Sequence, residues 1–358
     1  MKLNKKKVVI LISAIILLLF TMVLFVLYEG GPYDKNNKKD LVVDIPMGST
    51  VDDVAHILKE KNLIKNEFIF KINFKIKNSS SQMKSGSYLL NQSFSNNDII
   101  DKLISGEIYH DGVKITIPEG STSNEIIALL VKNELGKKEE FEELVKNPSV
   151  FYDEFEFLNQ EDIKTLEGFL YPSTYYFDED SKSEDIIKEM IALFDKNYTE
   201  ELEKRQEEME LTLQEVVNLA SIVEKEAVLD EDRPVIASVF YNRLEIDMPL
   251  QSDATIQYIF ETRKKSMTYD DLKIDSPYNS YIQKGLPPTP IANPGIKSIE
   301  AVLYPEDTDY LYFVADINGG NVYSKTYEEH QKNVEKYRKD RDERNKKLEE
   351  ASEESDQK

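Results

Sequence analysis

An apolar segment near the N-terminus constrains this chain more than any other feature. It runs from Val8 to Tyr28, and only Ser13 and Thr21 interrupt it. Its length meets the roughly 20 residues that a helix needs to cross the hydrocarbon core of a bilayer. Lysines at positions 2, 5, 6 and 7 precede it, so the positive-inside rule puts the N-terminus in the cytoplasm. No small-x-small cleavage site follows it. We therefore predict an uncleaved single-pass anchor in the cell membrane, with the remaining chain outside the cytoplasm.

The composition rules out several kinds of site and partner. The chain has 358 residues, a formal net charge of −22 and no cysteine. Disulfides, thiol catalysis and thiolate zinc sites are therefore excluded. The histidines at positions 56, 110 and 330 show no metal-site spacing, and we predict neither a metal nor a cofactor. A strongly acidic surface repels nucleic acid, so we predict no nucleic-acid partner.

A short motif occurs twice in the half of the chain that follows the anchor. Ile45–Thr50 reads IPMGST, and Ile117–Thr122 reads IPEGST. Each copy follows a β-rich run, and the closing threonine has an acid three residues later, which is a capping-box signal for a helix. A glycine-aromatic segment and a second amphipathic helix follow each copy. We predict two related small α+β units, which serve either as a duplicated folding module or as a binding or spacer element.

The C-terminal part has a different pattern, with long helical periodicity and little β character. Thr212 to Val228 and Asp232 to Leu244 are predicted helices. Residues 275–295 are rich in Pro, Gly, Tyr and Asn, and a loop of that length in a compact domain is usually functional. An alternating run at Tyr310–Ala315 and a second one at Asn321–Ser324 predict a short β element.

These patterns predict an α+β protein whose last folded domain is mostly helical. The end of the chain is nearly all charge, which is typical of a frayed helix or a disordered tail. The predicted parts are a cytoplasmic tail (1–7), a transmembrane anchor (8–28), a linker (29–40), an α+β unit (41–108), a second α+β unit (109–205), a catalytic domain (206–337) and a charged tail (338–358).

One stretch of the first C-terminal helix places carboxyl groups among apolar residues. On a helical projection, Glu224 falls inside the edge of the apolar face, Glu226 falls farther out, and Lys225 points to the opposite side. A carboxyl group that is partly removed from water resists ionising and can donate its proton to a leaving oxygen. The alternative is a solvated Glu-Lys-Glu group on a surface helix.

A series of short motifs follows in order along the chain: 115–120 (ITIPEG), 166–172 (LEGFLYP), 219–226 (LASIVEKE), 237–244 (ASVFYNRL), 250–253 (LQSD), 276–281 (SPYNSY), 285–288 (GLPP), 293–295 (NPG) and 310–315 (YLYFVA). Together these motifs resemble the endolytic murein transglycosylases of the MltG (YceG-like) family. Two departures from the family pattern are visible: Thr289 stands where glycine is expected, and Gly320-Asn321 stands where a Gly-His pair is expected.

The resemblance implies both a fold and a reaction. The two α+β units would be LysM-like, and the catalytic domain lysozyme-like. The enzyme would cleave the MurNAc-GlcNAc β-1,4 bond of nascent peptidoglycan strands near the membrane. It would leave 1,6-anhydro-MurNAc ends and terminate strand elongation. Glu224 would act as acid and then as base, and the 6-hydroxyl of the sugar would supply the nucleophile. Cell-wall synthases are the expected protein partners.

Further residues are candidates for holding the glycan strand. Gln251 and Asp253 could bind sugar hydroxyls or the acetamide group, although Asp253 could instead cap a helix. Tyr278, Asn279 and Tyr281 offer the aromatic and amide groups that sugar binding uses, although they could equally form a turn after a proline.

Two interpretations remain beside this assignment. Glu167 and Tyr171 precede a strand and are interpreted as structural residues. For the whole chain, the alternative function is a non-catalytic peptidoglycan-binding scaffold in a cell-wall synthesis complex.

Overall fold

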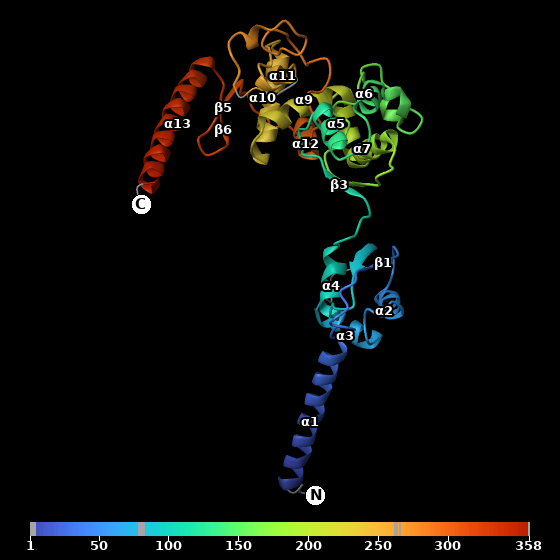
Figure 1. Cartoon of the computed structure of the whole chain (residues 1–358). Helices are drawn as coiled ribbons and strands as arrows, with labels where there is room; N and C mark the ends of the chain where they lie inside the picture. Colours follow the sequence, from blue (N-terminus) through green and yellow to red (C-terminus); the bar gives the residue numbers. More distant parts are fainter. Residues whose placement is uncertain (1–4, 78–82, 261–263, 265, 357–358) are drawn as a thin grey trace. The chain divides into compact units, whose positions relative to one another are not determined.

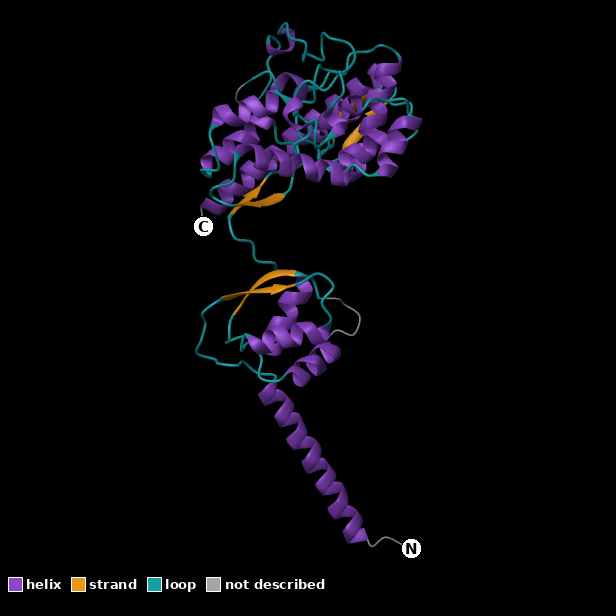
Figure 2. Cartoon of the chain, turned by 90° about the vertical axis from the view of Figure 1, so that its right-hand side faces the viewer, coloured by secondary structure: helices purple, strands orange, loops and turns teal. Residues whose placement is uncertain are grey.

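The computed structural model describes residues 5–77, 83–260, 264 and 266–356. The chain forms two compact units, Met1–Asp111 and Gly112–Lys358 (Figure 1). Helices make up most of both units, and the strands occur as short pairs (Figure 2). This agrees with the predicted α+β class and its mostly helical character.

The N-terminal helix α1 (Lys5–Glu29) is long and apolar. Its part from Leu11 to Glu29 has a mean hydropathy of 2.8 and is long enough to cross a membrane. Large apolar side chains such as Leu18 are exposed on it, which suits a helix surrounded by lipid. The helix is therefore compatible with the predicted anchor, whereas the orientation of the anchor stays a prediction.

The first unit pairs strand β1 (Leu41–Ile45) with strand β2 (Gly86–Leu90) in antiparallel register. Helices α2 (Val51–Glu60), α3 (Glu67–Lys77) and α4 (Asn96–Ser105) complete it. The predicted capping box at the start of α2 is present, and α4 begins with a second one. Apolar side chains from both strands and all three helices form its core, among them Val43, Leu58, Phe70, Tyr88 and Ile99.

The second unit opens with the same order of elements. Strand β3 (Val113–Thr116) pairs antiparallel with β4 (Thr174–Phe177). Helices α5 (Ser123–Lys132) and α6 (Lys138–Lys146) lie between these strands in sequence, and α7 (Ser183–Asn197) follows. Both units therefore run strand, two helices, strand, helix. The repeated motif predicts the first helix in each unit, and the structure adds a second before the next strand. The second copy differs by two short 3₁₀ helices between α6 and β4, at Pro148–Phe151 and Glu156–Leu158.

Helix α9 (Leu213–Glu226) lies at the centre of the remaining part. It packs against α10 (Arg233–Glu245), α11 (Asp253–Gln257) and α12 (Ile296–Leu303), while α8 (Glu200–Glu208) packs on α12. Its residues from 213 to 223, including polar ones, are buried except at position 215. One hydrophobic core joins these helices with β3, β4 and α5 to α7. The predicted boundary between 109–205 and 206–337 lies inside this unit and stays a prediction.

The end of the chain forms a hairpin and a helix. Strands β5 (Tyr312–Ala315) and β6 (Asn321–Ser324) pair antiparallel, as the alternating pattern indicates. Helix α13 (Tyr327–Asp356) packs on both and continues through most of the charged segment 338–358. Residues 275–295 contain no helix or strand, as predicted, but Asn293 makes an isolated β-bridge with Ser121. That bridge links the repeated motif to the long loop.

Candidate functional site

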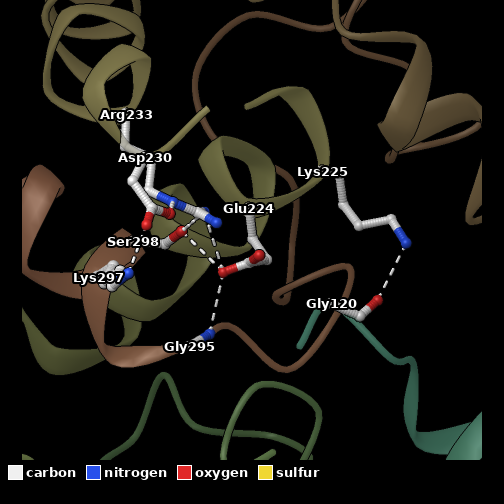
Figure 3. A network of polar contacts seen from close by, with 8 residues as sticks. All are labelled: Gly120, Glu224, Lys225, Asp230, Arg233, Gly295, Lys297 and Ser298. Atoms are coloured by element: carbon white, nitrogen blue, oxygen red, sulfur yellow. Dashed lines mark hydrogen bonds and ion pairs between the residues drawn. The ribbon is translucent and has the colours of Figure 1, made fainter. Parts of the chain in front are cut away.

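Glu224 lies in the last turn of α9, and its carboxyl group is held by three donors. Its Oε2 atom accepts hydrogen bonds from the Gly295 backbone N–H at 3.0 Å and the Ser298 hydroxyl at 2.8 Å. The Arg233 guanidinium lies 3.2 Å from the same oxygen, and only 6% of the Glu224 side chain is exposed. Figure 3 shows these donors converging on one oxygen. Among the described residues, Oε1 accepts no hydrogen bond.

The donors come from the starts of two helices that pack on α9. Gly295 is the N-cap of α12, and Ser298 lies in the first turn of that helix. The carboxyl group therefore sits at a helix N-terminus, where unpaired N–H groups favour negative charge. Arg233 is the first residue of α10 and is itself buried. It also hydrogen-bonds Ser298 and Asp230, and Asp230 pairs with Lys297.

This environment corrects the physical reason for choosing Glu224. The helical projection places it at the edge of an apolar face, where loss of water would keep the acid neutral. In the structure its carboxyl group is buried, as expected, but it contacts a guanidinium and two hydrogen-bond donors rather than an apolar surface. A projection of one helix cannot show this, because Arg233 and Ser298 belong to other helices.

Glu226, like Glu224, is half-buried. The Ser252 hydroxyl donates to its Oε1 at 2.5 Å. Burial raises the pKa of Glu226, and nearby Asp253 raises it further, while the Ser252 hydrogen bond and Arg243 act in the opposite direction. The expectation that Glu226 lies farther out than Glu224 stays a prediction, because both residues are half-buried.

Two of the five predicted substrate-binding residues, Asp253 and Tyr281, lie near Glu226. The Gln251 N–H donates to the Ser280 carbonyl at 2.9 Å, and Gln251 has an exposed side chain and a φ of 51°. The Tyr281 hydroxyl donates to Asp253 at 2.7 Å. The N-cap of α11 is Ser252 and not Asp253, so Asp253 does not cap this helix. Among the described residues, no hydrogen bond or ion pair joins these candidates to Glu224.

Two of these five candidates are occupied by interactions inside the loop. Asn279 is fully buried, and its amide donates to the carbonyls of Leu272 and Ile274. The Tyr278 hydroxyl and the Thr289 hydroxyl are 2.8 Å apart. Both residues shape the turn, which is the alternative that the sequence left open for them.

The two departures from the family pattern are accommodated. Thr289 is buried and hydrogen-bonds Tyr278, so the hydroxyl that replaces a glycine has a partner. Asn321 donates to the buried carboxylate of Asp232 at 3.1 Å. Neither position contacts Glu224 through a hydrogen bond or ion pair among the described residues.

A surface pocket of about 430 Å³ is lined by Gly120 and Lys225, which adjoin Glu224, although Glu224 itself does not line it. The first turn of α5 and the loop Ile117–Ser121 form most of its wall, and Lys225 lines it from α9. The Lys225 ammonium donates to the Gly120 carbonyl at 3.0 Å. A Cβ atom on Gly120 would lie 3.3 Å from Cγ of Glu224, so the repeated motif reaches the candidate acid directly. A second pocket, of about 500 Å³, lies farther along α9 and does not include Glu224.

Sequence reasoning missed the partners of Glu224. Arg233 precedes a proline in a predicted helix, a position that carries no signal for a buried cation. Gly295 ends the family-like segment 293–295, and Ser298 follows it. That segment pointed to the loop but not to its donor groups. No group of three or more His, Asp or Glu residues that could hold a metal ion occurs in the described part of the chain.

Comparisons with known proteins agree with the sequence motifs. The YceG-like family model matches residues 43–336. A Bacillus subtilis (strain 168) protein named endolytic murein transglycosylase is 40% identical over 316 residues, covering 86% of this chain and 87% of that protein. A protein of the same name from Streptococcus pneumoniae serotype 2 is 35% identical over 338 residues, and the match spans 60% of its length.

A solved structure has a related fold. A yceG-like protein from Listeria monocytogenes, determined at 2.6 Å, aligns with a TM-score of 0.57 and 38% sequence identity. The alignment covers 82% of this chain and 99% of the Listeria chain. Because the family model spans most of the chain and the Bacillus relative matches over nearly its full length, the chain belongs to the YceG-like family.

Proposed function

We propose that this chain is a membrane-anchored lytic transglycosylase that cleaves peptidoglycan strands internally, with Glu224 as its acid and base. Its relatives named endolytic murein transglycosylases support the reaction class. The observation that carries the residue assignment is the asymmetry of the Glu224 carboxyl group. Three donors hold Oε2, while Oε1 has no partner among the described residues.

The first step is proton donation. Because Oε2 accepts two hydrogen bonds and pairs with Arg233, the proton of the acid form sits on Oε1. Glu224 gives this proton to the glycosidic oxygen between MurNAc and GlcNAc as the bond from C1 of MurNAc to that oxygen breaks. Arg233, the Gly295 N–H and Ser298 then stabilise the carboxylate that is left, because they are already aimed at it.

The second step uses the sugar's own hydroxyl. The 6-hydroxyl of the same MurNAc attacks C1, and Glu224 accepts its proton, which yields a 1,6-anhydro end and regenerates the acid. No water is consumed. A nucleophile on the same ring has a high effective concentration, so a second catalytic carboxylate is unnecessary.

The glycan strand is proposed to lie along α9. Of the predicted substrate-binding residues, Gln251 and Asp253 are exposed, Tyr278 and Tyr281 are half-buried, and Asn279 is buried. Tyr278 and Asn279 act on the strand through the loop that they hold. The two units of like topology are proposed to be LysM-like, and the helical part that follows to be lysozyme-like.

The cellular role follows from the anchor. We propose that the N-terminus is cytoplasmic and that the catalytic part faces the wall. Cleavage close to the membrane would then release or terminate nascent strands, in company with cell-wall synthases. The hydropathy of α1 supports a span, and the lysines ahead of it support the orientation.

Product analysis of Glu224→Gln tests the proposal. The amide keeps the shape of the carboxyl group but cannot donate the required proton. We expect purified glycan strands to yield 1,6-anhydro ends with the parental chain and at least a thousandfold fewer with Glu224→Gln, measured by mass spectrometry. Glu245→Gln, an exposed change on α10, is the control and should match the parent.

Other outcomes separate the alternatives. Reducing ends in place of anhydro ends would indicate a hydrolase. Strand binding without cleavage by the parental chain would support the non-catalytic scaffold. Anhydro ends formed by Glu224→Gln at the parental rate would remove Glu224 from the reaction.

A further inference from the structure

A second carboxyl group, on Glu167, is buried among hydrogen-bond donors. Glu167 is 4% exposed and lies between the 3₁₀ helices and β4. Its two oxygens accept from the Ser123 N–H at 2.9 and 3.2 Å. The Asn293 amide donates at 3.0 Å, and the Tyr258 hydroxyl at 3.1 Å. No lysine or arginine forms an ion pair with it in the described part of the chain, so these donors alone compensate its burial.

Asn293 carries the connection from Glu167 to the rest of the fold. It is 0% exposed, and its amide nitrogen donates to the Ser121 carbonyl as well as to Glu167. Its amide oxygen accepts from the backbone N–H groups of Gly168 and Leu170 at 2.9 and 2.8 Å. All the hydrogen-bonding capacity of this side chain is therefore used.

The backbone around Asn293 reaches Glu224 from two sides. The Asn293 carbonyl accepts from the Gly120 N–H at 2.9 Å, and Gly120 lies against the Glu224 side chain. Two residues after Asn293, the Gly295 N–H donates to Oε2 of Glu224. One buried amide thus ties together the two backbone segments that contact the candidate acid.

We propose that Glu167 is a positioning residue for Glu224, which it serves by holding Asn293 and, through it, the Gly120 and Gly295 segments. Glu167 touches neither substrate nor the reacting atoms. Glu167 orients the Asn293 amide. The amide nitrogen faces two acceptors, Glu167 and the Ser121 carbonyl, so an oxygen atom in its place would lose both hydrogen bonds. This inference rests on the proposed function only for its kinetic consequence, and not for the structural link.

A reciprocal exchange of acid and amide tests the link. Asn293→Asp places an acceptor against two acceptors, and we expect kcat to fall at least 100-fold. Glu167→Gln retains one oxygen for Ser123 and should lower kcat about tenfold. In the double variant, the amide introduced at position 167 can donate to the carboxylate introduced at position 293. We expect it to recover at least fivefold over Asn293→Asp, which a merely additive loss of structure would not produce.

Stability and kinetics are separated by a matched control. Phe141→Leu removes volume from the core at α6, away from Glu224, and should lower the unfolding temperature while changing kcat less than twofold. The loss of activity in the Glu167 and Asn293 variants should appear in kcat, with KM changed less than threefold. The reason is that the acid is displaced while the binding surface is kept.

Hydrogen exchange of the full-length chain tests the link without the reaction. In Glu167→Gln, the amides of segments 117–123 and 292–296 should exchange at least tenfold faster, while those of α6 keep the parental rate. Two results would overturn the inference: amide hydrogen exchange at the parental rate in both segments of Glu167→Gln, or a double variant whose kcat is no higher than that of Asn293→Asp. If the parental chain forms no anhydro ends, the proposed function fails, and hydrogen exchange alone decides the role of Glu167.

Discussion

Arg233 and Glu224 form a buried ion pair. Under the proposed function, this pair would orient the acid as well as stabilise the fold. Both side chains are under 10% exposed, and Arg233 also holds Ser298, a second donor to the same carboxyl oxygen. Removing one member of such a pair leaves an uncompensated buried charge. The residue therefore affects both the fold and the reaction, and the two effects can be measured separately.

Replacing Arg233 by methionine should lower both activity and stability. We expect kcat for anhydro-end formation to fall on the order of 100-fold, because a preorganised donor to the carboxylate is lost. The free energy of unfolding should fall by about 3 kcal/mol. Arg233→Lys should restore part of kcat, because it returns the charge without the forked geometry. Parental kcat in Arg233→Met would exclude this role; strand cleavage assays and urea unfolding provide the measurements.

The Glu167 carboxyl group makes stability depend on pH. Burial raises the pKa of Glu167 from 4.5 to about 7, Glu125 adds to the rise, and hydrogen bonds from Ser123 and Tyr258 oppose it. Between these two pH values the folded chain keeps a proton that the unfolded chain releases. The free energy of unfolding should therefore fall as pH rises through this window, by at most about 3 kcal/mol. Urea unfolding of the detergent-solubilised chain measures this.

Glu167→Gln is the control for that dependence, since its side chain does not titrate. The slope of stability against pH between 4.5 and about 7 should be shallower in this variant. An unchanged slope would assign the dependence to other groups.

At the level of elements, the site depends on how closely the segment before β4 approaches α9. Gly168 has a φ of 95°, and a Cβ there would lie 2.6 Å from Val217 and 2.7 Å from Pro290. Gly285, in the long loop, has a φ of 77°, and a Cβ atom there would have no neighbouring atom within 4 Å. The two glycines share a left-handed backbone, but only Gly168 also has a steric limit.

Alanine at these two glycines separates backbone strain from collision. Gly285→Ala should lose about 1 kcal/mol, because only the positive φ is strained. Gly168→Ala should lose at least about 3 kcal/mol, since α9 or the loop must also move. We expect anhydro-end formation to fall only in Gly168→Ala, because that segment is held to Asn293. Equal losses of stability would show that the close packing has no energetic effect; thermal unfolding decides.

At the scale of the whole molecule, α1 and the absence of cysteine allow a direct test of topology. Single cysteines placed at Lys5 and Lys35 flank the apolar segment. With the N-terminus in the cytoplasm, a membrane-impermeant maleimide should label Lys35→Cys in intact cells and Lys5→Cys only after permeabilisation. The parental chain, which has no thiol, is the unlabelled control. The reverse pattern would invert the proposed orientation.

Local sequence patterns predicted the elements well. The capping boxes at Thr50, Thr122 and Thr212 are all formed, because a hydroxyl and an acid three residues apart need only their own helix turn. The repeated motif indicated two units of like topology, because each copy has its own β-rich run and its own helix start signal. The apolar length of α1 needed no tertiary information. The order of motifs also indicated the family and, with it, Glu224.

Only the tertiary structure decided what surrounds that glutamate. Arg233 and Ser298 reach it from two other helices, and Gly295 from the end of a long loop, so no periodicity within α9 could place them. The same holds for Glu226, to which the loop before α11 donates a hydrogen bond, and for Glu167, whose place beside a strand indicated only a structural role. Sequence spacing determines which side chains share a helix face; burial and hydrogen bonding depend on segments far apart in the chain, and folding alone brings those together.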